Sequence, residues 1–328
     1  MRRTSPIVTV VIPMLDEAGA IESCLAGFGG QTYPHEYLDV LVVDGGSTDG
    51  SRETVEALAV EHPWIRVIDN PARRASAAFN RGVASAKGDV VCLFSAHGVP
   101  DSAYVEASVD ALDRTGAAGV GGRYDHVGTD AVSTAIGRAM VSPFGMASPH
   151  RFATEPREVD TISHPAYRAS ALADVGPFDE SLGRNSDYEL NHRLRVAGHR
   201  LVFDPSIASV YRPRPDLTAL ARQFWHYGRW KPRVVRGHPA ALRLRHLVAP
   251  AAVIGLVLSP LLIRARWGRN LLKLAGFGYV GVVGAGVIRA DPRAHGADPI
   301  TLAAAFPVMH ASWGAGFLVT IAEDGLGG

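Results

Sequence analysis

The stretch Leu38–Ser51, LDVLVVDGGSTDGS, decides how this chain folds. Leu38–Val43 is rich in β-branched residues and predicts a buried strand that ends at Asp44. Two glycines then allow a tight turn. Ser47 is expected to cap the helix that follows, with Asp49 in its first turn. A strand leading directly into a helix is typical of a sheet built from βαβ units.

The segments on both sides repeat this alternation of strand and helix. Further strands are predicted at Ile7–Ile12, Ile65–Ile68 and Val90–Phe94, and further helices at Ile21–Phe28 and Ala75–Ala86. This order predicts an α/β fold with a doubly wound, mainly parallel sheet flanked by helices. Ligands bind such sheets beyond the carboxyl ends of the strands, so the loops after Ile12, Val43 and Phe94 are expected to meet in one crevice.

The charge balance, hydrophobic content and cysteine count exclude several classes of protein. The chain has 328 residues, with 33 Lys and Arg against 32 Asp and Glu, which argues against a general nucleic-acid binder. Hydrophobic residues make up 47%, so disorder is excluded and a sizeable core is possible. The only cysteines, Cys24 and Cys92, are far apart in sequence and support neither a disulfide framework nor a thiolate zinc site. Two structural units are expected.

Charge is distributed unevenly, because residues 1–210 carry a net −9 and residues 211–328 a net +10. Residues 211–246 contain nine basic side chains and a single acid, Asp216. Apolar residues recur there at helical spacing, with Trp225 and Trp230 among them. This pattern predicts a basic amphipathic helix in a membrane interface. The alternative is a helix packed on the N-terminal α/β domain with a solvated basic face.

Three uncharged apolar runs follow, at Leu247–Ile263, Leu274–Ile288 and Ile300–Ile321. Each is near the roughly 20 residues needed to cross a bilayer, and they predict a helical membrane-associated region. Buried helices of a soluble fold are the alternative. The link Arg264–Arg269 holds three arginines, which the positive-inside rule would keep in the cytosol. A re-entrant hairpin and three full crossings both remain open. The predicted domains are 1–210, 211–246 and 247–328.

Several motifs in this order resemble family 2 glycosyltransferases of the GT-A type. Within that family, the chain is most similar to the succinoglycan-biosynthesis, ExoA-like branch. The resemblance covers about residues 7–230. It implies a nucleotide-sugar donor, a saccharide or lipid-linked acceptor and membrane association. The motifs are Pro13–Glu17, Asp44–Ser51, Asn80–Gly82 with Gly88-Asp89, Gly176–Glu180 and Asp187–Leu190.

The resemblance assigns donor-binding residues to the strand-end loops. Asp44 can accept a hydrogen bond from a uracil-type N–H, and Asp16 or Glu17 can contact the ribose or the base edge. The glycines allow the backbone to approach the ligand closely. A tight strand-to-helix turn with Asp as a cap is the structural alternative. The predicted nucleotide-sugar-binding residues are Pro13, Asp16, Glu17, Asp44, Gly45, Ser47, Arg74 and Asn80.

The metal site departs from the family pattern. Relatives of this type place Asp-X-Asp after the fourth strand to hold Mg²⁺ or Mn²⁺, whereas this chain has Ser95-Ala96-His97. Imidazole suits Mn²⁺ better than Mg²⁺, and a neutral serine hydroxyl is a poor cation ligand. His97 is therefore the candidate ligand of a divalent cation, and a structural histidine is the alternative. Nearby arginines could also neutralise the diphosphate.

Candidate catalytic and acceptor residues lie further along the chain. The resemblance implies that Asp187, beside Ser186 at the head of a helix, is the general base. A helix-capping carboxylate is the alternative. Gln223, Arg229 and Trp230 are predicted to contact the acceptor or the diphosphate, or else to pack at an interface.

The sequence thus predicts an inverting glycosyltransferase at the cell membrane with a cytoplasmic catalytic domain. It would move a sugar from a nucleotide-sugar, UDP-linked by expectation, to a lipid-linked saccharide or growing exopolysaccharide. Two alternatives remain: a polyprenyl-phosphate sugar synthase, and a degenerate, non-catalytic relative that scaffolds an assembly complex. Ser95 and Ser186, each replacing an expected acid, motivate the scaffold hypothesis.

Overall fold

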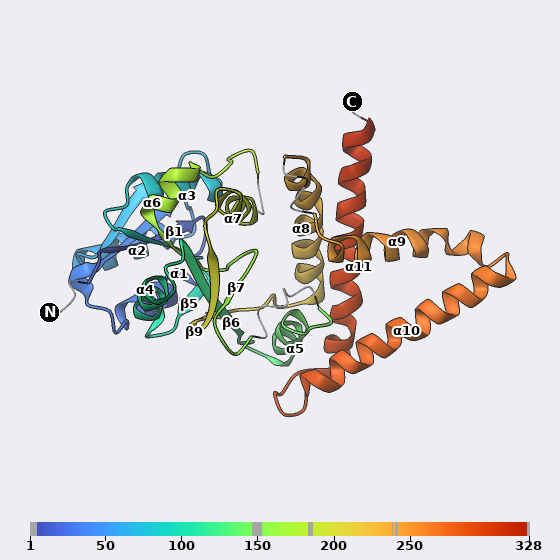
Figure 1. The fold of residues 1–328 in the computed structure, drawn as a ribbon. Helices are drawn as coiled ribbons and strands as arrows, with labels where there is room; N and C mark the ends of the chain where they lie inside the picture. Colours follow the sequence, from blue (N-terminus) through green and yellow to red (C-terminus); the bar gives the residue numbers. More distant parts are fainter. Residues whose placement is uncertain (1–4, 146–152, 183–185, 238, 240–241, 327–328) are drawn as a thin grey trace. The chain divides into compact units, whose positions relative to one another are not determined.

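The structure is a computed structural model that describes residues 5–145, 153–182, 186–237, 239 and 242–326. It divides into two compact units (Figure 1). The first comprises Met1–Asp125 and His150–Tyr211, and the second His126–Pro149 and Arg212–Gly328. The sequence-based division at residue 210 had kept residues 126–149 with the transferase domain. The structure groups them with the C-terminal helices instead, because α5 (Ala131–Met140) packs on α11 (Pro299–Leu326).

The first half of the first unit is the predicted parallel sheet. Its strands are β1 (Val8–Met14), β2 (Leu38–Asp44), β3 (Ile65–Asp69) and β4 (Val90–Leu93), in the order β3-β2-β1-β4. All three pairings are parallel. The intervening helices are α1 (Ile21–Gly29), α2 (Ser51–Glu61) and α3 (Ala75–Ala84), and a 3₁₀ turn spans His35–Tyr37.

The second half of the sheet is antiparallel where its pairings are described. β8 (Ala166–Arg168) pairs antiparallel with both β4 and β6 (Gly119–His126). β9 (Leu201–Tyr211) pairs antiparallel with β5 (Gly98–Pro100) and β7 (Arg157–Glu158). The sheet is therefore mixed, and the expectation of a mainly parallel sheet holds for its N-terminal half. The helices here are α4 (Tyr104–Thr115), α6 (Ala169–Val175) and α7 (Ser186–Val196).

The core explains why the early strands carry apolar residues on both of their faces. Successive strand residues point to opposite faces, so a sheet covered on both sides needs a continuous apolar run. Val10 and Ile12 pack in one buried cluster and Val11 packs in the other, on the α3 side. Gly82 lets α3 lie directly on the sheet, because a Cβ there would come within 2.1 Å of Val11.

One predicted helix start is wrong. α2 begins at Ser51 after Gly50, whose φ of 90° only glycine adopts readily, and not at Ser47. Ser47 and Asp49 instead bind the loop that follows β1. Because Ser47 and Asp49 make these tertiary contacts, Ser47 does not cap the helix, and α2 begins about one turn later.

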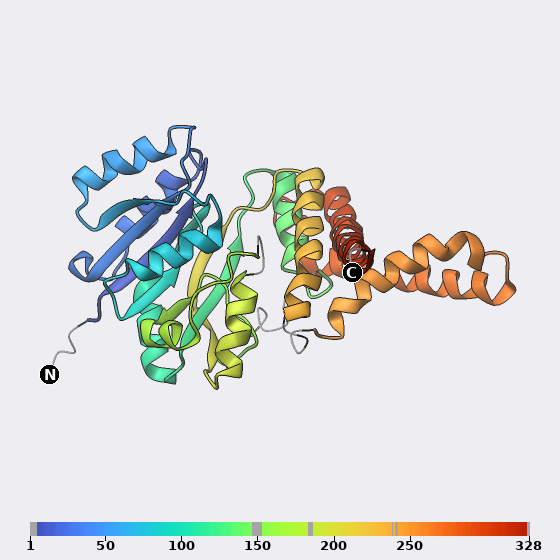
Figure 2. The same ribbon diagram turned by 90° about the horizontal axis from the view of Figure 1, so that it is seen from above.

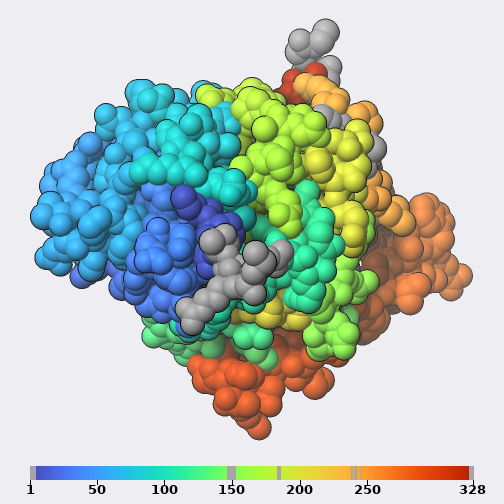
Figure 3. All heavy atoms as spheres, turned by 60° about the vertical axis from the view of Figure 1, so that its left-hand side comes forward, coloured from blue at the N-terminus to red at the C-terminus, as the bar shows by residue number. Residues whose placement is uncertain are grey.

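The segment after β8 returns to the N-terminal half of the sheet. In the space-filling view the yellow-green residues that contain α6 lie beside the cyan residues of α3 (Figure 3). Phe79 and Phe178 stack there with ring centroids 5.2 Å apart. The acceptor-side segment predicted from Gly176–Glu180 thus meets the helix that follows β3.

The second unit is helical and centred on α11. Its members are α5, α8 (Leu217–Gly237), α9 (Arg245–Leu262), α10 (Arg266–Ala290) and α11. α8 and α11 approach closely at glycines: a Cβ on Gly228 would lie 2.1 Å from the carbonyl oxygen of Trp313. Figure 2 shows α9 and α10 extending together away from this pair.

Two helices, Arg266–Ala290 and Pro299–Asp324, are long and apolar enough to cross a membrane by length and composition. His246–Leu262 is apolar but shorter. The two long helices differ in burial, since 6% of the apolar window of α10 is buried against 44% for α11. The apolar side chains of α10 are therefore mostly exposed, whereas α11 is also the central helix of the second unit.

Candidate active site

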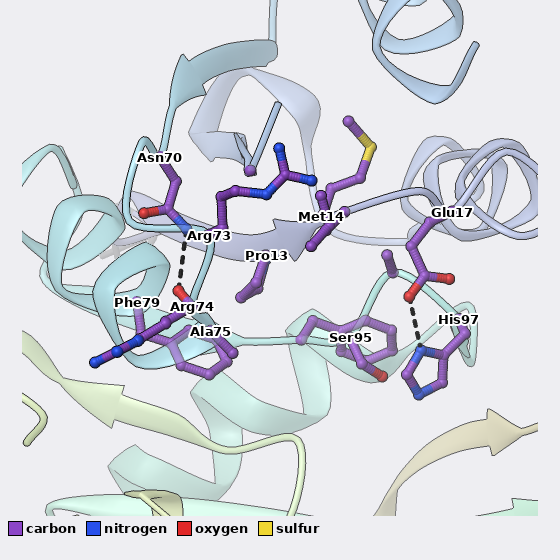
Figure 4. A pocket seen from close by; sticks show the side chains of 14 residues that line it. Pro13, Met14, Glu17, Asn70, Arg73, Arg74, Ala75, Phe79, Ser95 and His97 are labelled. Atoms are coloured by element: carbon purple, nitrogen blue, oxygen red, sulfur yellow. Dashed lines mark hydrogen bonds and ion pairs between the residues drawn. The ribbon is translucent and has the colours of Figure 1, made fainter. Parts of the chain in front are cut away.

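A cavity of about 290 Å³ lies within the first unit at the carboxyl edge of the parallel strands. Glu17, Ser95 and His97 lie at one end of it, and Asn70 and Phe79 at the other (Figure 4). This is the position at which ligands bind doubly wound sheets. The lining residues are Pro13, Met14, Leu15, Glu17, Gly45, Asn70, Arg73, Arg74, Ala75, Phe79, Phe94, Ser95, Ala96 and His97.

Side chains of the Asp44–Ser51 motif hold the loop after β1. The Ser47 hydroxyl accepts the backbone N–H of Asp16 at 3.0 Å, and Asp16 Oδ1 accepts the N–H of Thr48 at 2.8 Å. Asp49 accepts the N–H of Ala18 at 2.9 Å. Asp16 adopts a φ of 54°, a left-handed conformation that Asp tolerates better than most residues. The motif therefore shapes one wall of the cavity by binding backbone groups.

Asp44 lies behind this wall with 1% of its surface exposed. Its carboxylate accepts the Ser47 hydroxyl at 2.6 Å and Arg52 Nη1 at 3.1 Å. Burial raises the pKa of Asp44, but the hydrogen bonds from Ser47 and Arg52 outweigh burial and leave the pKa below its usual value. Asp44 is thus an ionised anchor, and its neighbour Gly45 is the residue that lines the cavity.

The end of the cavity near α3 is basic. Arg73 and Arg74 both line it, and Arg73 adopts a φ of 52° while its Nη1 donates to the Gly46 carbonyl at 3.3 Å. Arg74 donates to the Glu180 carbonyl at 3.0 Å, and Asn70 donates to the Arg74 carbonyl at 3.0 Å. Two guanidinium groups beside an open cavity suit a phosphate-bearing ligand.

The opposite end combines an acid with an imidazole. His97 Nδ1 lies 3.5 Å from Glu17 Oε1, and both side chains are partly exposed. The ring of His97 also meets Tyr211 edge-on at 6.0 Å between centroids. Carboxylate and imidazole are both possible ligands for Mn²⁺. Among the described residues, no three His, Cys, Asp or Glu side chains gather into a group that could hold a metal by themselves.

Asn80 supports the cavity without lining it. It bonds both the backbone and the Glu180 side chain of the segment after α6. Four of the predicted residues therefore support the cavity without lining it: Asn80, Asp16, Asp44 and Ser47. Pro13, Glu17, Gly45, Arg74 and His97 are the predicted residues that line it.

The predicted base Asp187 is exposed in the first turn of α7 and is not among the cavity-lining residues. Glu189, two residues later, is buried and bonds Arg193 Nε at 2.6 Å and Nη2 at 2.9 Å. Arg193 also donates to the carbonyls of Val175 and Pro177. Glu189 therefore braces the segment Val175–Pro177 through Arg193, and Asp187 is the exposed acid of this turn.

The α8 residues belong to the second unit and are engaged there. Gln223 accepts Arg214 Nε at 3.1 Å and donates to the Tyr227 hydroxyl at 3.0 Å. Arg229 pairs with Glu323 of α11. The guanidinium of Arg233 lies 4.4 Å above the ring of Trp230. These contacts show how α8 is held in its own unit.

Asn70 and Phe79 are among the lining residues that sequence reasoning did not identify. Asn70 directly follows β3, so the rule that ligands gather at strand ends could have identified it. Its Oδ1 is buried without a hydrogen-bond partner. Phe79 carried no such signal, because one aromatic residue on a helix is more often a core residue.

Residues 9–179 match the glycosyl transferase family 2 model, and the chain belongs to this family. It is a glycosyltransferase. It is 34% identical over 317 residues to the succinoglycan biosynthesis protein ExoA of Rhizobium meliloti, covering 96% of this chain and 94% of that protein. It is also 27% identical over 238 residues to a dolichyl N-acetyl-alpha-D-glucosaminyl phosphate 3-beta-D-2,3-diacetamido-2,3-dideoxy-beta-D-glucuronosyltransferase of Methanococcus voltae, covering 70% and 74%.

Solved structures agree on the fold. The Pyrobaculum calidifontis mannosyltransferase PcManGT, in complex with GDP-Man and Mn²⁺, superimposes with a TM-score of 0.63 at 20% identity, covering 94% of this chain and 87% of that one. GalNAc-T7 with UDP, GalNAc and Mn²⁺ gives 0.53 at 17% identity, over 70% and 48%. The predicted GT-A fold is thereby confirmed.

Proposed function

We propose that this glycosyltransferase is an inverting enzyme that moves a sugar from a UDP-linked donor to a lipid-linked saccharide or a growing exopolysaccharide. The observation that carries the proposal is the cavity at the strand ends, with two arginines at one end and Glu17 and His97 at the other. The likeness to ExoA and to a transferase named for a dolichyl-linked sugar phosphate supports the class of acceptor.

The loop after β1 and the Asp44–Ser51 motif form the surface that would bind the donor. Pro13 and Gly45 offer backbone to the nucleoside, and Asp16, Asp44 and Ser47 hold that backbone in place. Arg73 and Arg74 neutralise the diphosphate, which carries the negative charge of the leaving group. Asn80 fixes the segment on which Arg74 rests.

A divalent cation fits this site if the donor shares in its coordination. Glu17 and His97 would supply one oxygen and one nitrogen ligand, and phosphate oxygens would supply others. The cation would stabilise the charge that develops on the departing diphosphate. Mn²⁺ is the favoured ion because of the imidazole. Titration of Mn²⁺ followed by electron paramagnetic resonance, with UDP present, should show tighter binding for the wild type than for His97→Ala.

Asp187 is the proposed base. In a single displacement, the acceptor oxygen forms a bond to C1 of the sugar while the bond from C1 to the phosphate oxygen breaks. The acceptor hydroxyl proton passes to the Asp187 carboxylate, and the configuration at C1 inverts. Asp187 is an exposed residue in the first turn of α7, which supports this role.

We further place the protein at the cell membrane with its catalytic unit in the cytoplasm. α10 has an 18-residue apolar window that is 6% buried, which is unfavourable in water. Arg264, between α9 and α10, and Arg266 and Arg269 in the first turn of α10 suit a phospholipid headgroup layer.

The test is a panel of nucleotide-sugars, assayed for binding and for transfer with and without Mn²⁺. Asp187→Asn should keep donor affinity and reduce transfer by at least about 100-fold, the usual contribution of a general base. Asp179→Asn is the matched control, since the Asp179 carboxylate accepts the N–H of Ser181, two residues along the same loop. Transfer by Asp187→Asn at the wild-type rate would exclude Asp187 as the base, and such transfer to a polyprenyl phosphate would favour the synthase alternative. Absence of donor binding in the wild type would favour the scaffold alternative.

A further inference from the structure

Behind the cavity, three side chains of the first unit form a continuous hydrogen-bonded line. Ser95 Oγ lies 2.8 Å from His164 Nε2, and His164 Nδ1 lies 2.9 Å from Ser209 Oγ. Ser95 lines the cavity just after β4, while Ser209 belongs to β9. The line therefore runs from the buried sheet to the ligand space, at the position where Asp-X-Asp was expected.

The imidazole in the middle of this line is tightly held. His164 is buried, stacks on Phe94 with ring centroids 3.9 Å apart, and meets Tyr124 edge-on at 4.5 Å. Its carbonyl accepts the Tyr104 hydroxyl at 2.9 Å. Its φ of 41° is unusual for a residue with a side chain, so the surrounding contacts stabilise a strained backbone.

Gly98 leaves the space that this ring needs. A Cβ at position 98 would lie 2.8 Å from His164 Cε1 and 3.2 Å from Ser95 Oγ. The aromatic packing around His164, its strained backbone and the absence of a side chain at Gly98 all fix the position of the imidazole next to Ser95. Such convergence is typical of a site that positions a ligand.

A neutral hydroxyl–imidazole–hydroxyl line can point in either direction. If Ser95 donates to Nε2, its lone pairs face the cavity and suit a cation. If Ser209 donates to Nδ1 and Nε2–H donates to Ser95, the Ser95 proton is free for an anion. The second direction aligns every dipole toward the ligand, so an anion strengthens each bond in turn.

We propose that Ser95 donates a hydrogen bond to a phosphate group of the nucleotide donor, and that His164 and Ser209 are positioning residues that orient its proton. Arg73 and Arg74 line the same cavity and favour an anionic group there. This inference rests on the proposed function. It gives Ser95 a role in binding the diphosphate rather than a cation.

The experiment compares UDP with uridine by calorimetry, in EDTA and in Mn²⁺. Ser95→Ala should weaken UDP binding about tenfold in both media, because a hydrogen bond to a charged group is lost, and should leave uridine binding unchanged. His164→Asn retains a residue that tolerates a positive φ but cannot reach both serines, and it should weaken UDP binding about threefold. Ser206→Ala is the matched control on β9, since its hydroxyl bonds Asp204 instead.

A spectroscopic measurement tests whether His164 and Ser209 orient the Ser95 proton or only pack in the sheet. Imidazole ¹⁵N shifts of His164 should show the proton on Nε2 when UDP is bound, and the Ser209→Ala variant should lose this preference. Unchanged UDP affinity in Ser95→Ala, or a proton on Nδ1 in the UDP complex, would overturn the proposal. A loss of affinity confined to Mn²⁺ would overturn it as well, since Ser95 would then be a metal ligand. If the wild type bound no nucleoside diphosphate of any base, the proposed function itself would fail.

Discussion

The side-chain amide of Asn80 is paired with the backbone of Phe178 in both directions. Asn80 Nδ2 donates to the Phe178 carbonyl at 3.0 Å, and the Phe178 N–H donates to Asn80 Oδ1 at 2.7 Å. These residues are 98 positions apart in sequence. The pair joins α3 to the acceptor-side segment, whose Glu180 carbonyl holds the cavity residue Arg74. One amide therefore connects α3, beside the cavity, to the segment that follows α6.

Asn80→Ala should release this connection. Two partly buried hydrogen bonds are lost, so we expect the free energy of unfolding of the first unit to fall by about 2 kcal/mol. Hydrogen exchange at the Phe178 amide should accelerate before global unfolding. Glu180→Gln keeps an acceptor oxygen near Asn80 and serves as the control. Equal protection of the Phe178 amide in Asn80→Ala and wild type would contradict the assignment.

Asp44 should make stability depend on pH in a defined direction. Its pKa in the folded protein is lowered, so the ionised carboxylate stabilises the fold above the unfolded pKa of about 4. That contribution is lost as pH falls through the folded-state value. The stability difference between wild type and Asp44→Asn should therefore be about 2 kcal/mol at pH 7 and shrink toward pH 3.

Chemical denaturation at several pH values checks this prediction. Asp110→Asn, which removes an exposed carboxylate of α4, is the control and should shift stability little at any pH. A difference for Asp44→Asn that stays constant from pH 7 to 3 would show that the carboxylate does not titrate in this range. Asp44→Ala should also weaken UDP binding, since Ser47 and Gly45 lose their anchor.

The contact between α8 and α11 gives a test of the second unit. Gly228→Ala would place a Cβ about 2.1 Å from the Trp313 carbonyl oxygen, which forces the helices apart. Overpacking of this kind costs about 1–3 kcal/mol. Gly281→Ala in α10 is the matched control, because its added Cβ meets no described residue within 4 Å outside the backbone of its own helix. The thermal midpoint should fall for the first variant and hold or rise for the second; the reverse order would refute the packing.

Membrane binding should depend on α10. Leu274 and Phe277 are 73% and 77% exposed, and a double change to Asp should abolish flotation with vesicles that contain anionic phospholipid. Val60→Asp removes a side chain that is 86% exposed on α2 and should leave flotation unchanged. Flotation of the double variant at the wild-type level would show that α10 is not the membrane contact.

Much of the site could be predicted from strand ends alone. Glu17, Gly45 and His97 line the cavity as predicted because each follows a parallel strand, and strand direction brings such positions to one edge. Asp44 is the last residue of such a strand, yet its carboxylate turns to Ser47 and Arg52. A strand-end position places the backbone, but the choice of partner depends on which donors the fold brings near.

Local pattern by itself determined the strands and helices of the parallel half, since a continuous run such as Val8–Ile12 is stable only when both faces of a strand are buried. It also determined the apolar character of the last three helices. Only the tertiary structure decided that Ser95 meets His164 and Ser209, that Asn80 meets Phe178, and that residues 126–149 join the C-terminal unit. These contacts join residues tens to more than a hundred positions apart, and contact at such separation depends on packing that no local periodicity encodes.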